Sequence, residues 1–253
     1  MKKFPLFLLI VFFSLAPIRI LLAEEVDSRQ KLISIIEKSN RFYASVKNYT
    51  AIFLKQEMAK GKLGDTERIF LKFEKPFKIF MGWLNTEKKG LQVVYQRGRH
   101  DGKLAIHKPG LGLGLLPVVF LDQKSPWVRE GSEAYDIEDA GIGTFLEDFT
   151  EAVKRGDAAG QLKVEFVPSE SAGEEMADVT FEGSKEDSGY FAYKVRVSFD
   201  PATSLPVKMK LYDWKDRMTG DYAYENLKID LAPEDSEFKK QINRSLYRVY
   251  QAK

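Results

Sequence analysis

The fold is decided by the stretch from Asn48 to Trp83, NYTAIFLKQEMAKGKLGDTERIFLKFEKPFKIFMGW. Its second half places apolar or aromatic side chains at alternate positions, namely Ile69, Leu71 and Phe73, and then Phe77, Ile79, Met81 and Trp83. Lys, Gln and Glu fill many of the intervening positions. This period of two is typical of strands with one buried and one solvated face. We therefore expect three consecutive strands joined by two turns.

The same alternation returns later in the chain and predicts strands at 91–97, 103–108, 162–167, 176–183, 190–199, 206–213 and 219–229. Residues 98–102 and 200–204 have turn composition. Apolar spacing of three and four predicts helices over 26–46 and 141–155, and a short helix is expected at 235–240. In the second helix, Thr144 and Glu147 have the spacing of a capping box.

These elements predict a mainly β fold of the α+β class. About ten strands form a curved antiparallel sheet, which tends to curl into an incomplete barrel. The leading helix and an inserted helix and loop lid are expected to cover its concave side. We expect one domain over residues 24–240 and a basic, frayed C-terminal tail over 241–253.

The first residues resemble an export signal. Lys2 and Lys3 precede an apolar run that begins at Phe4, and Ala23 ends a plausible cleavage site. We expect residues 1–23 to be a signal peptide and the mature protein to be periplasmic and soluble. An uncleaved membrane anchor is the alternative, which Arg19 disfavours because it shortens the run. The chain has no cysteine, so disulfides, thiolate catalysis and a cysteine-linked lipid anchor are excluded.

Residues 109–126, PGLGLGLLPVVFLDQKSP, interrupt the alternation with glycines that alternate with leucines. One interpretation is a loop folded over the core, whose leucines complete that core. The other is a flexible flap over an apolar cavity, because repeated glycines permit motion and leucines suit a hydrophobic ligand.

The sequence shows no catalytic constellation. His100 and His107 lie at a predicted turn and on the strand after it, but Asp101 is too little to complete a metal site. The serines lack a nucleophile elbow, and GLGLG lacks the spacing of a dinucleotide fingerprint. The net charge of +2 disfavours a nucleic-acid partner. We expect no enzymatic activity, no cofactor and no metal.

Five short motifs follow one another along the chain. They are Tyr49-Thr50-Ala51-x-Phe53-x-x-Gln56, Lys75-Pro76-Phe77, Asp101-Gly102-Lys103-Leu104, Asp200-Pro201-x-x-x-Leu205-Pro206-Val207 and Tyr222-x-Tyr224-x-x-Leu227. In this order they resemble the lipoprotein-localisation carriers of the LolA/LolB type, and still more closely an uncharacterised family of secreted bacterial proteins related to them. The resemblance spans most of residues 28–230. It implies an incomplete barrel, lidded by helices, whose apolar wall accepts acyl chains.

The candidate ligand-binding residues belong to this wall and to the flap and helix above it. They are Phe53, Leu71, Phe73, Ile79, Met81, Trp83, Leu113, Leu115, Val119, Phe145 and Phe149. Lys75 stands where the carriers have an arginine that helps to hold the lid closed through forked hydrogen bonds. Lysine keeps the charge and loses the fork, so Lys75 is the candidate for an altered lid control.

The expected function is that of a periplasmic binding or carrier protein that holds a lipid acyl chain or another hydrophobic ligand. Its partners would be a lipid or a lipidated protein, with transient membrane contact. The alternative is a cell-envelope protein-interaction module without a lipid ligand, in which an apolar groove receives a segment of a partner protein.

Overall fold

The computed structural model describes residues 16–109, 118–125, 136–169, 171–183, 189–230 and 236–252. The first strands are β1 (Asn48–Ala59), β2 (Lys62–Leu63), β3 (Glu67–Glu74), β4 (Lys78–Trp83), β5 (Gln92–Gln96), β6 (Leu104–His107) and β7 (Val119–Leu121). The later strands are β8 (Leu162–Val167), β9 (Glu175–Phe181), β10 (Lys194–Phe199), β11 (Pro206–Tyr212) and β12 (Met218–Ile229). The helices are α1 (Ala16–Ser45), α3 (Ile142–Ala158), α5 (Ser236–Gln241) and α6 (Arg244–Gln251), with short 3-10 turns η1 (His100–Gly102) and η2 (Ile137–Asp139).

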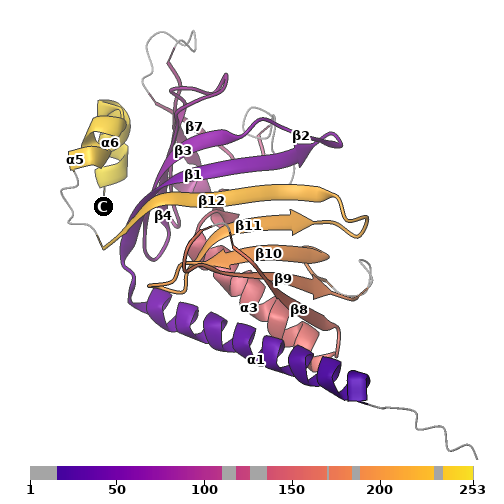
Figure 1. Ribbon diagram of the computed structural model, residues 1–253. Coiled ribbons are helices and arrows are strands. Elements are labelled where there is room, and N and C mark those ends of the chain that lie inside the picture. The colour runs from indigo at the N-terminus through magenta and orange to yellow at the C-terminus, as the bar shows by residue number, and fades with distance from the viewer. Residues whose placement is uncertain are drawn as a thin grey trace, which may run out of the picture.

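The described strands form a 12-stranded antiparallel sheet in the order β7-β6-β5-β4-β3-β1-β12-β11-β10-β9-β8, with β2 paired to β1. Strands β7 and β8 lie at the two ends of this order, so the sheet is open and does not close into a barrel (Figure 1). The predicted mainly β, antiparallel, incompletely closed fold is confirmed. The short strands β2 and β7 were not predicted.

One face of the sheet, called the inner face from here on, lies under helices α1 and α3 (Figure 1). Helix α1 packs on β8 and α3, and α3 packs on β8 and β11. The predicted apolar stripe of α1 is buried at Leu32, Ile35 and Ile36. The helix begins at Ala16, earlier than expected. In the described part of the chain, no helix has the length and apolar character needed to cross a bilayer.

The opposite, outer face carries a second apolar cluster under helices α5 and α6 (Figure 1). Its sheet side consists of Phe70, Phe80, Val94 and Ala105, and its helix side of Phe238, Ile242, Leu246 and Tyr250. The expectation of a frayed tail after residue 240 is wrong, because α6 is an ordered helix whose Leu246 and Tyr250 are buried. Phe80 and Phe238 make the central edge-to-face contact, with ring centroids 5.2 Å apart.

A side-chain amide fastens this helical pair to the sheet. Gln92 donates from Nε2 to the carbonyl of Gln241 at 2.7 Å and accepts from the backbone N–H of Asn243 at 2.7 Å. Asn243 is also the N-cap of α6, because its side chain accepts from the N–H groups of Ser245 and Leu246. The turn between α5 and α6 is therefore fixed to β5 from both sides.

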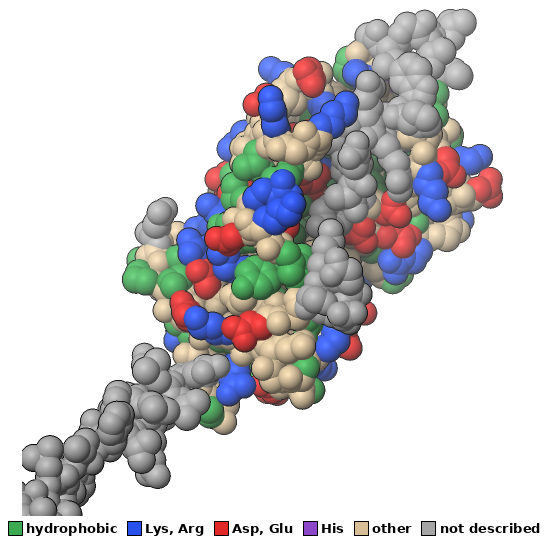
Figure 2. Space-filling model, turned by 90° about the vertical axis from the view of Figure 1, so that its right-hand side faces the viewer, with side chains coloured by type: hydrophobic (Ala, Val, Ile, Leu, Met, Phe, Trp, Pro, Cys, Tyr) green, Lys and Arg blue, Asp and Glu red, His purple; other side chains and the backbone are tan. Residues whose placement is uncertain are grey.

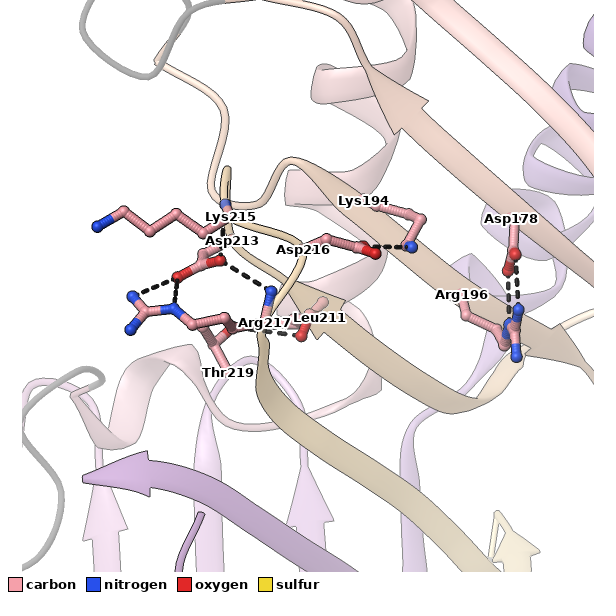
Figure 3. Close-up of polar contacts among 9 residues, drawn as sticks. All are labelled: Asp178, Lys194, Arg196, Leu211, Asp213, Lys215, Asp216, Arg217 and Thr219. Atoms are coloured by element: carbon pink, nitrogen blue, oxygen red, sulfur yellow. Dashed lines mark hydrogen bonds and ion pairs between the residues drawn. The ribbon is translucent and has the colours of Figure 1, made fainter. Parts of the chain in front are cut away.

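Elsewhere the outer face is polar and carries several ion pairs, as Figure 3 shows for the region of β9 to β12. Arg196 of β10 binds Asp178 of β9 through two nitrogen–oxygen pairs, at 2.6 and 2.7 Å. In the turn between β11 and β12, Asp213 accepts from both the backbone and the guanidinium of Arg217. The bidentate pair of Arg196 with Asp178 adds geometric specificity as well as energy. The buried sheet residues of the outer cluster thus all lie on β3 to β6.

Candidate functional site

The inner face of β1, β3 and β4 carries three successive rows of apolar side chains that run across the strands. The first row, at the middle of β1, consists of Phe53, Ile69 and Trp83. Toward the start of β1 follow the second row, Ala51, Leu71 and Met81, and the third row, Tyr49, Phe73 and Ile79. We call these nine residues the apolar wall. The six wall residues predicted on these strands therefore lie side by side on one face, because residues directly opposite in a ladder share a face.

The wall is buried throughout, except at Trp83 in the row nearest Lys55. Ile69, Leu71 and Ile79 are fully buried, whereas Trp83 keeps part of its surface exposed. A ligand that reaches any of the three rows must therefore displace whatever covers them. From Tyr49 to Lys55 the strand extends about 20 Å at the usual rise per residue.

Aromatic stacking extends the wall onto the neighbouring strand. Phe53 stacks on Tyr224 with ring centroids 4.9 Å apart, and on Tyr222 at 6.0 Å. Both tyrosines come from β12, which pairs with β1. Such offset pairs add stability beyond their buried area. The first row of the wall is thus continuous with the inner face of the second half of the sheet.

The row that follows Phe53 along β1 is charged. Lys55 lies opposite Glu67 of β3 on one side and Tyr222 of β12 on the other. Two further charges complete the group, Glu57 on β1 and Lys88 in the turn between β4 and β5. We call the two lysines and two glutamates the charged rim. Figure 2 views the molecule from this end of β1 and shows Lys, Arg, Asp and Glu side chains interspersed with apolar ones.

The charged rim is internally paired. Lys88 Nζ lies 2.6 Å from Glu67 Oε1, and the indole N–H of Trp83 donates to Glu67 Oε2 at 3.0 Å. Burial alone would raise the pKa of Glu67, but the hydrogen bonds from Lys88 and Trp83 outweigh burial and lower that pKa. Glu67 is therefore ionised at neutral pH although its side chain is only 13% exposed.

The second carboxylate of the rim is held in the same way. Lys55 Nζ lies 2.9 Å from Glu57 Oε2, and the hydroxyl of Tyr222 donates to Glu57 Oε1 at 3.0 Å. The exposed fractions of the two charged side chains are 18% and 10%. The rim thus combines two cations and two anions in a partly desolvated setting directly beside the wall.

At the other end of the wall, three tyrosine hydroxyls hold the start of helix α3. Tyr49 accepts from the N–H of Ile142 at 3.0 Å. Tyr224 accepts from the N–H of Gly141, and Tyr43 accepts from the N–H of Gly143. Burial is the main cause that raises the pKa of all three phenols, to about 12 for Tyr43. All three are therefore neutral hydroxyls at physiological pH.

The predicted capping box at the start of this helix is wrong. The N-cap is Gly141, at φ 118°, and no side chain caps it locally. Thr144 lies inside the helix and donates from Oγ1 to the carbonyl of Glu138 at 3.1 Å. The first N–H groups of a helix lack partners within it. Here tyrosines from α1, β1 and β12 supply acceptors that a local capping residue would otherwise provide.

Lys75 contacts the end of helix α1. Its Nζ donates to the carbonyl of Tyr43 at 2.5 Å and to that of Ala44 at 3.4 Å. It also lies 4.1 Å from the centroid of the Tyr43 ring. A cation at a helix C-terminus satisfies unpaired carbonyls and opposes the helix dipole. Lys75 therefore fixes the end of the helix that covers the inner face, and its role in lid control stays a prediction.

The remaining predicted site residues fall in three places. Leu113 and Leu115 lie outside the described residues. Val119 is half-buried in edge strand β7 and lies opposite Ile106 of β6. Phe145 and Phe149 stack on each other in α3 at 5.4 Å, and Phe145 makes an edge contact with Phe191. The two helix phenylalanines thus contact each other and Phe191, above the second half of the sheet.

The histidines do not assemble a metal site. His100 packs against the ring of Phe120, with centroids 4.9 Å apart. Within the described segments, no three His, Asp or Glu side chains come close enough to hold a metal ion.

Sequence reasoning missed the charged rim and the tyrosine acceptors. The rim was detectable, because Lys55, Glu57 and Glu67 continue the inward parity of Phe53 and Ile69. Charges at inward positions of an otherwise apolar alternation are the signal. The tyrosine contacts with α3 had no local signal, since they join residues far apart in the chain.

These features define a class: an open antiparallel sheet with an apolar inner wall, a charged rim and helices on both faces. The chain belongs to a family described as a protein of unknown function, DUF1571, whose model matches residues 46–246. This agrees with the expected relation to an uncharacterised family. No protein of curated function matches the sequence.

Solved structures with a distant likeness include a putative outer membrane lipoprotein-sorting protein domain from Vibrio parahaemolyticus. It is 13% identical, with 81% of this chain and 96% of that chain covered and a TM-score of 0.37. A LolA superfamily protein from Nitrosomonas europaea is 13% identical, with 84% and 97% covered and a TM-score of 0.34. The MucA/MucB complex of Pseudomonas aeruginosa is 18% identical, with 83% and 60% covered and a TM-score of 0.40.

Proposed function

We propose that this protein is an exported, periplasmic binding or carrier protein that holds a lipid acyl chain or another hydrophobic ligand against its apolar wall. The observation that carries the proposal is the arrangement of the inner face, in which three apolar rows end at a charged rim. A surface with this polarity matches an amphiphile, since the chain finds apolar area and the polar end finds charges and water.

The dimensions support the same ligand class. The strand length of about 20 Å from Tyr49 to the rim exceeds the roughly 15 Å of hydrocarbon in one leaflet of a bilayer. An acyl chain therefore fits along the strands with its polar end at the rim. Binding of this kind depends on buried area and needs no catalytic group, so we assign the protein no enzymatic step.

A closed, ligand-free state is part of the proposal. The deepest wall residues are fully buried, so loading requires a cover to move. Lys75 and the end of α1 are the candidates for controlling this movement, because Lys75 joins the sheet to the helix that covers the inner face. The partners would be a lipid or a lipidated protein, met during transient contact with a membrane.

A pair of substitutions in one edge strand tests the proposal. Val119 lies on the inner side of β7 beside Ile106, whereas its neighbour Phe120 is 44% exposed and contacts His100. Val119→Asp is expected to weaken binding of a fluorescent fatty acid about tenfold or more, since a carboxylate beside the chain is poorly solvated. Phe120→Asp places the same charge one residue away and serves as the matched control.

Three readings of this experiment are informative. Weaker binding by Val119→Asp alone, with unchanged unfolding midpoints, supports the inner face as the binding surface. Equal binding by both variants places the ligand elsewhere. No binding by the unaltered protein contradicts the proposal itself.

The alternative function is a protein-interaction module of the cell envelope. The observation that favours it is strand β7, the last strand in the order of the described sheet, with Phe120 at its surface, because an edge strand can pair with a strand of another protein. Under this alternative, Phe120→Asp would abolish complex formation, and fatty-acid binding would be absent from all variants.

A further inference from the structure

The charged rim lies where the polar end of a bound amphiphile would lie, and this placement specifies the kind of polar end. Along β1 the inward positions change from Tyr49, Ala51 and Phe53 to Lys55 and Glu57. The change is abrupt, from three apolar rows to charges. The inference that follows rests on the proposed function and deepens it by naming the headgroup.

Stability alone gives little reason for charges at these positions. The four charged side chains are between 10% and 28% exposed, so each is partly removed from water. Desolvation of an ion pair offsets most of the Coulomb attraction, and apolar residues in such places are often as stabilising or more so. On the outer face, ion pairs such as Arg68 with Glu225 are nearly half exposed and carry no such cost.

The signs of the charges alternate across the rim. Lys88 pairs with Glu67, Lys55 lies opposite Glu67 in the ladder, and Lys55 pairs with Glu57. The group therefore sums to zero but presents cations and anions side by side. Two neutral donors flank it, the indole N–H of Trp83 and the hydroxyl of Tyr222, each bound to one of the carboxylates.

We propose that the charged rim binds the headgroup of a zwitterionic aminophospholipid, with its phosphate at the lysines and its ammonium at the glutamates. A purely anionic headgroup meets Glu57 and Glu67 as well as the lysines, and a purely cationic one meets both lysines. A headgroup that carries both a negative and a positive charge finds an opposite charge for each of them, and neither has to face a like charge. Lys88 lies in a turn and not in a strand, so its side chain can leave Glu67 and bind a phosphate instead.

Competition between two lipids tests this directly. The protein is incubated with vesicles of equimolar phosphatidylethanolamine and phosphatidylglycerol, recovered by size exclusion, and its extracted lipid is quantified by mass spectrometry. We expect the bound lipid to contain about ten molecules of phosphatidylethanolamine for each molecule of phosphatidylglycerol. The double variant Glu57→Gln with Glu67→Gln is expected to lose this enrichment, because the repulsion of the anionic lipid and the partners of the ammonium are both removed.

Two further variants keep the test sharp. Glu225→Gln removes a carboxylate from the outer face of β12 and should leave the enrichment unchanged. Lys88 lies in a turn, so Lys88→Gln does not disturb the sheet. This variant should capture less of both lipids, and the loss should be larger for phosphatidylglycerol than for phosphatidylethanolamine. Lys88→Gln should raise the ratio of phosphatidylethanolamine to phosphatidylglycerol, and the double glutamate variant should lower it. If both variants shift this ratio in the same direction, charge complementarity does not explain the lipid preference.

The remaining outcomes separate the inference from the proposed function. Capture of both lipids in equal amounts overturns the headgroup assignment and leaves the acyl-binding wall standing. Capture of neither lipid overturns both. Glycerophosphoethanolamine, the same headgroup without chains, should leave bound lipid in place at equal concentration; if it displaces the lipid, the site is one for soluble zwitterions.

Discussion

The hydroxyl of Tyr49 accepts a hydrogen bond from the backbone N–H of Ile142 at 3.0 Å, across a separation of 93 positions in the chain. Tyr49 belongs to the row of the apolar wall that lies farthest from the charged rim, and Ile142 begins the helix inserted above the sheet. This contact joins the wall to the helix that covers the second half of the inner face.

Tyr49→Phe should destabilise the protein by about 1–3 kcal/mol, because it leaves a buried N–H without its acceptor. Urea unfolding measures the change. Tyr212→Phe on the outer side of β11 is the control and should stay within about 0.5 kcal/mol of the unaltered protein. If the two substitutions cost the same, the hydroxyl does not hold α3.

Gly143→Ala should destabilise the fold although Ala is the better helix former. A Cβ at this position would lie 2.3 Å from Tyr43 Oη and 2.5 Å from two of its ring carbons. Thermal unfolding measures the loss. The double variant with Tyr43→Ala removes the clash, so Gly143→Ala should then be neutral or stabilising; a persistent loss in that background would refute the contact.

Stability should fall at alkaline pH in a way that depends on Tyr43. Burial raises its pKa from 10.0 to about 12 in the folded protein. A group whose pKa is raised on folding stabilises fully below its unfolded pKa, and that stability is lost as pH rises through the folded value. The loss lies between about pH 10 and 12, with a slope of at most about 1.4 kcal/mol per pH unit for one proton.

Comparison with Tyr43→Phe isolates this effect, because both proteins keep Lys75 and every other titrating group. Urea midpoints at about pH 9 and about pH 11 should converge as pH rises. A constant difference between the two proteins across this range would show that the phenol titrates normally.

Gln92→Ala should loosen the C-terminal helices from the outer face. The amide makes two hydrogen bonds to the turn between α5 and α6, and their loss is expected to cost about 1–3 kcal/mol locally. Hydrogen exchange should accelerate in residues 238–250 and not in α1. Gln96→Ala, at the other end of β5, is the matched control, and equal acceleration by both variants would contradict a specific fastening.

Alternation of side chains was enough to predict most of the sheet. In β3 and β4 the inward residues repeat without interruption, so the face they share could be read directly from the sequence. The same parity also contained a signal that was not used: Phe70 and Phe80 point outward, which indicates a cover on the outer face. Part of that cover, helix α6, comes from the segment expected to be a frayed tail, and the rest is the short helix expected at 235–240.

The elements that sequence could not predict depend on distant partners. An eight-residue helix such as α6 is marginal alone, and its order comes from packing of Leu246 and Tyr250 on the sheet. The start of α3 has a capping-box pattern at Thr144, yet tyrosines from three other elements supply the acceptors. In both places the tertiary contacts contribute more free energy than the local helix and capping preferences of the sequence, so they determine the structure.

The central claim is that the apolar wall holds an acyl chain, and the lipid content of the native protein tests it most directly. The protein is purified from its native compartment without detergent, its lipids are extracted, and mass spectrometry measures their amount per chain. We predict acyl lipid in about stoichiometric amount, rich in zwitterionic headgroups. Lipid-free protein that copurifies with another polypeptide would contradict the account and favour the protein-interaction module.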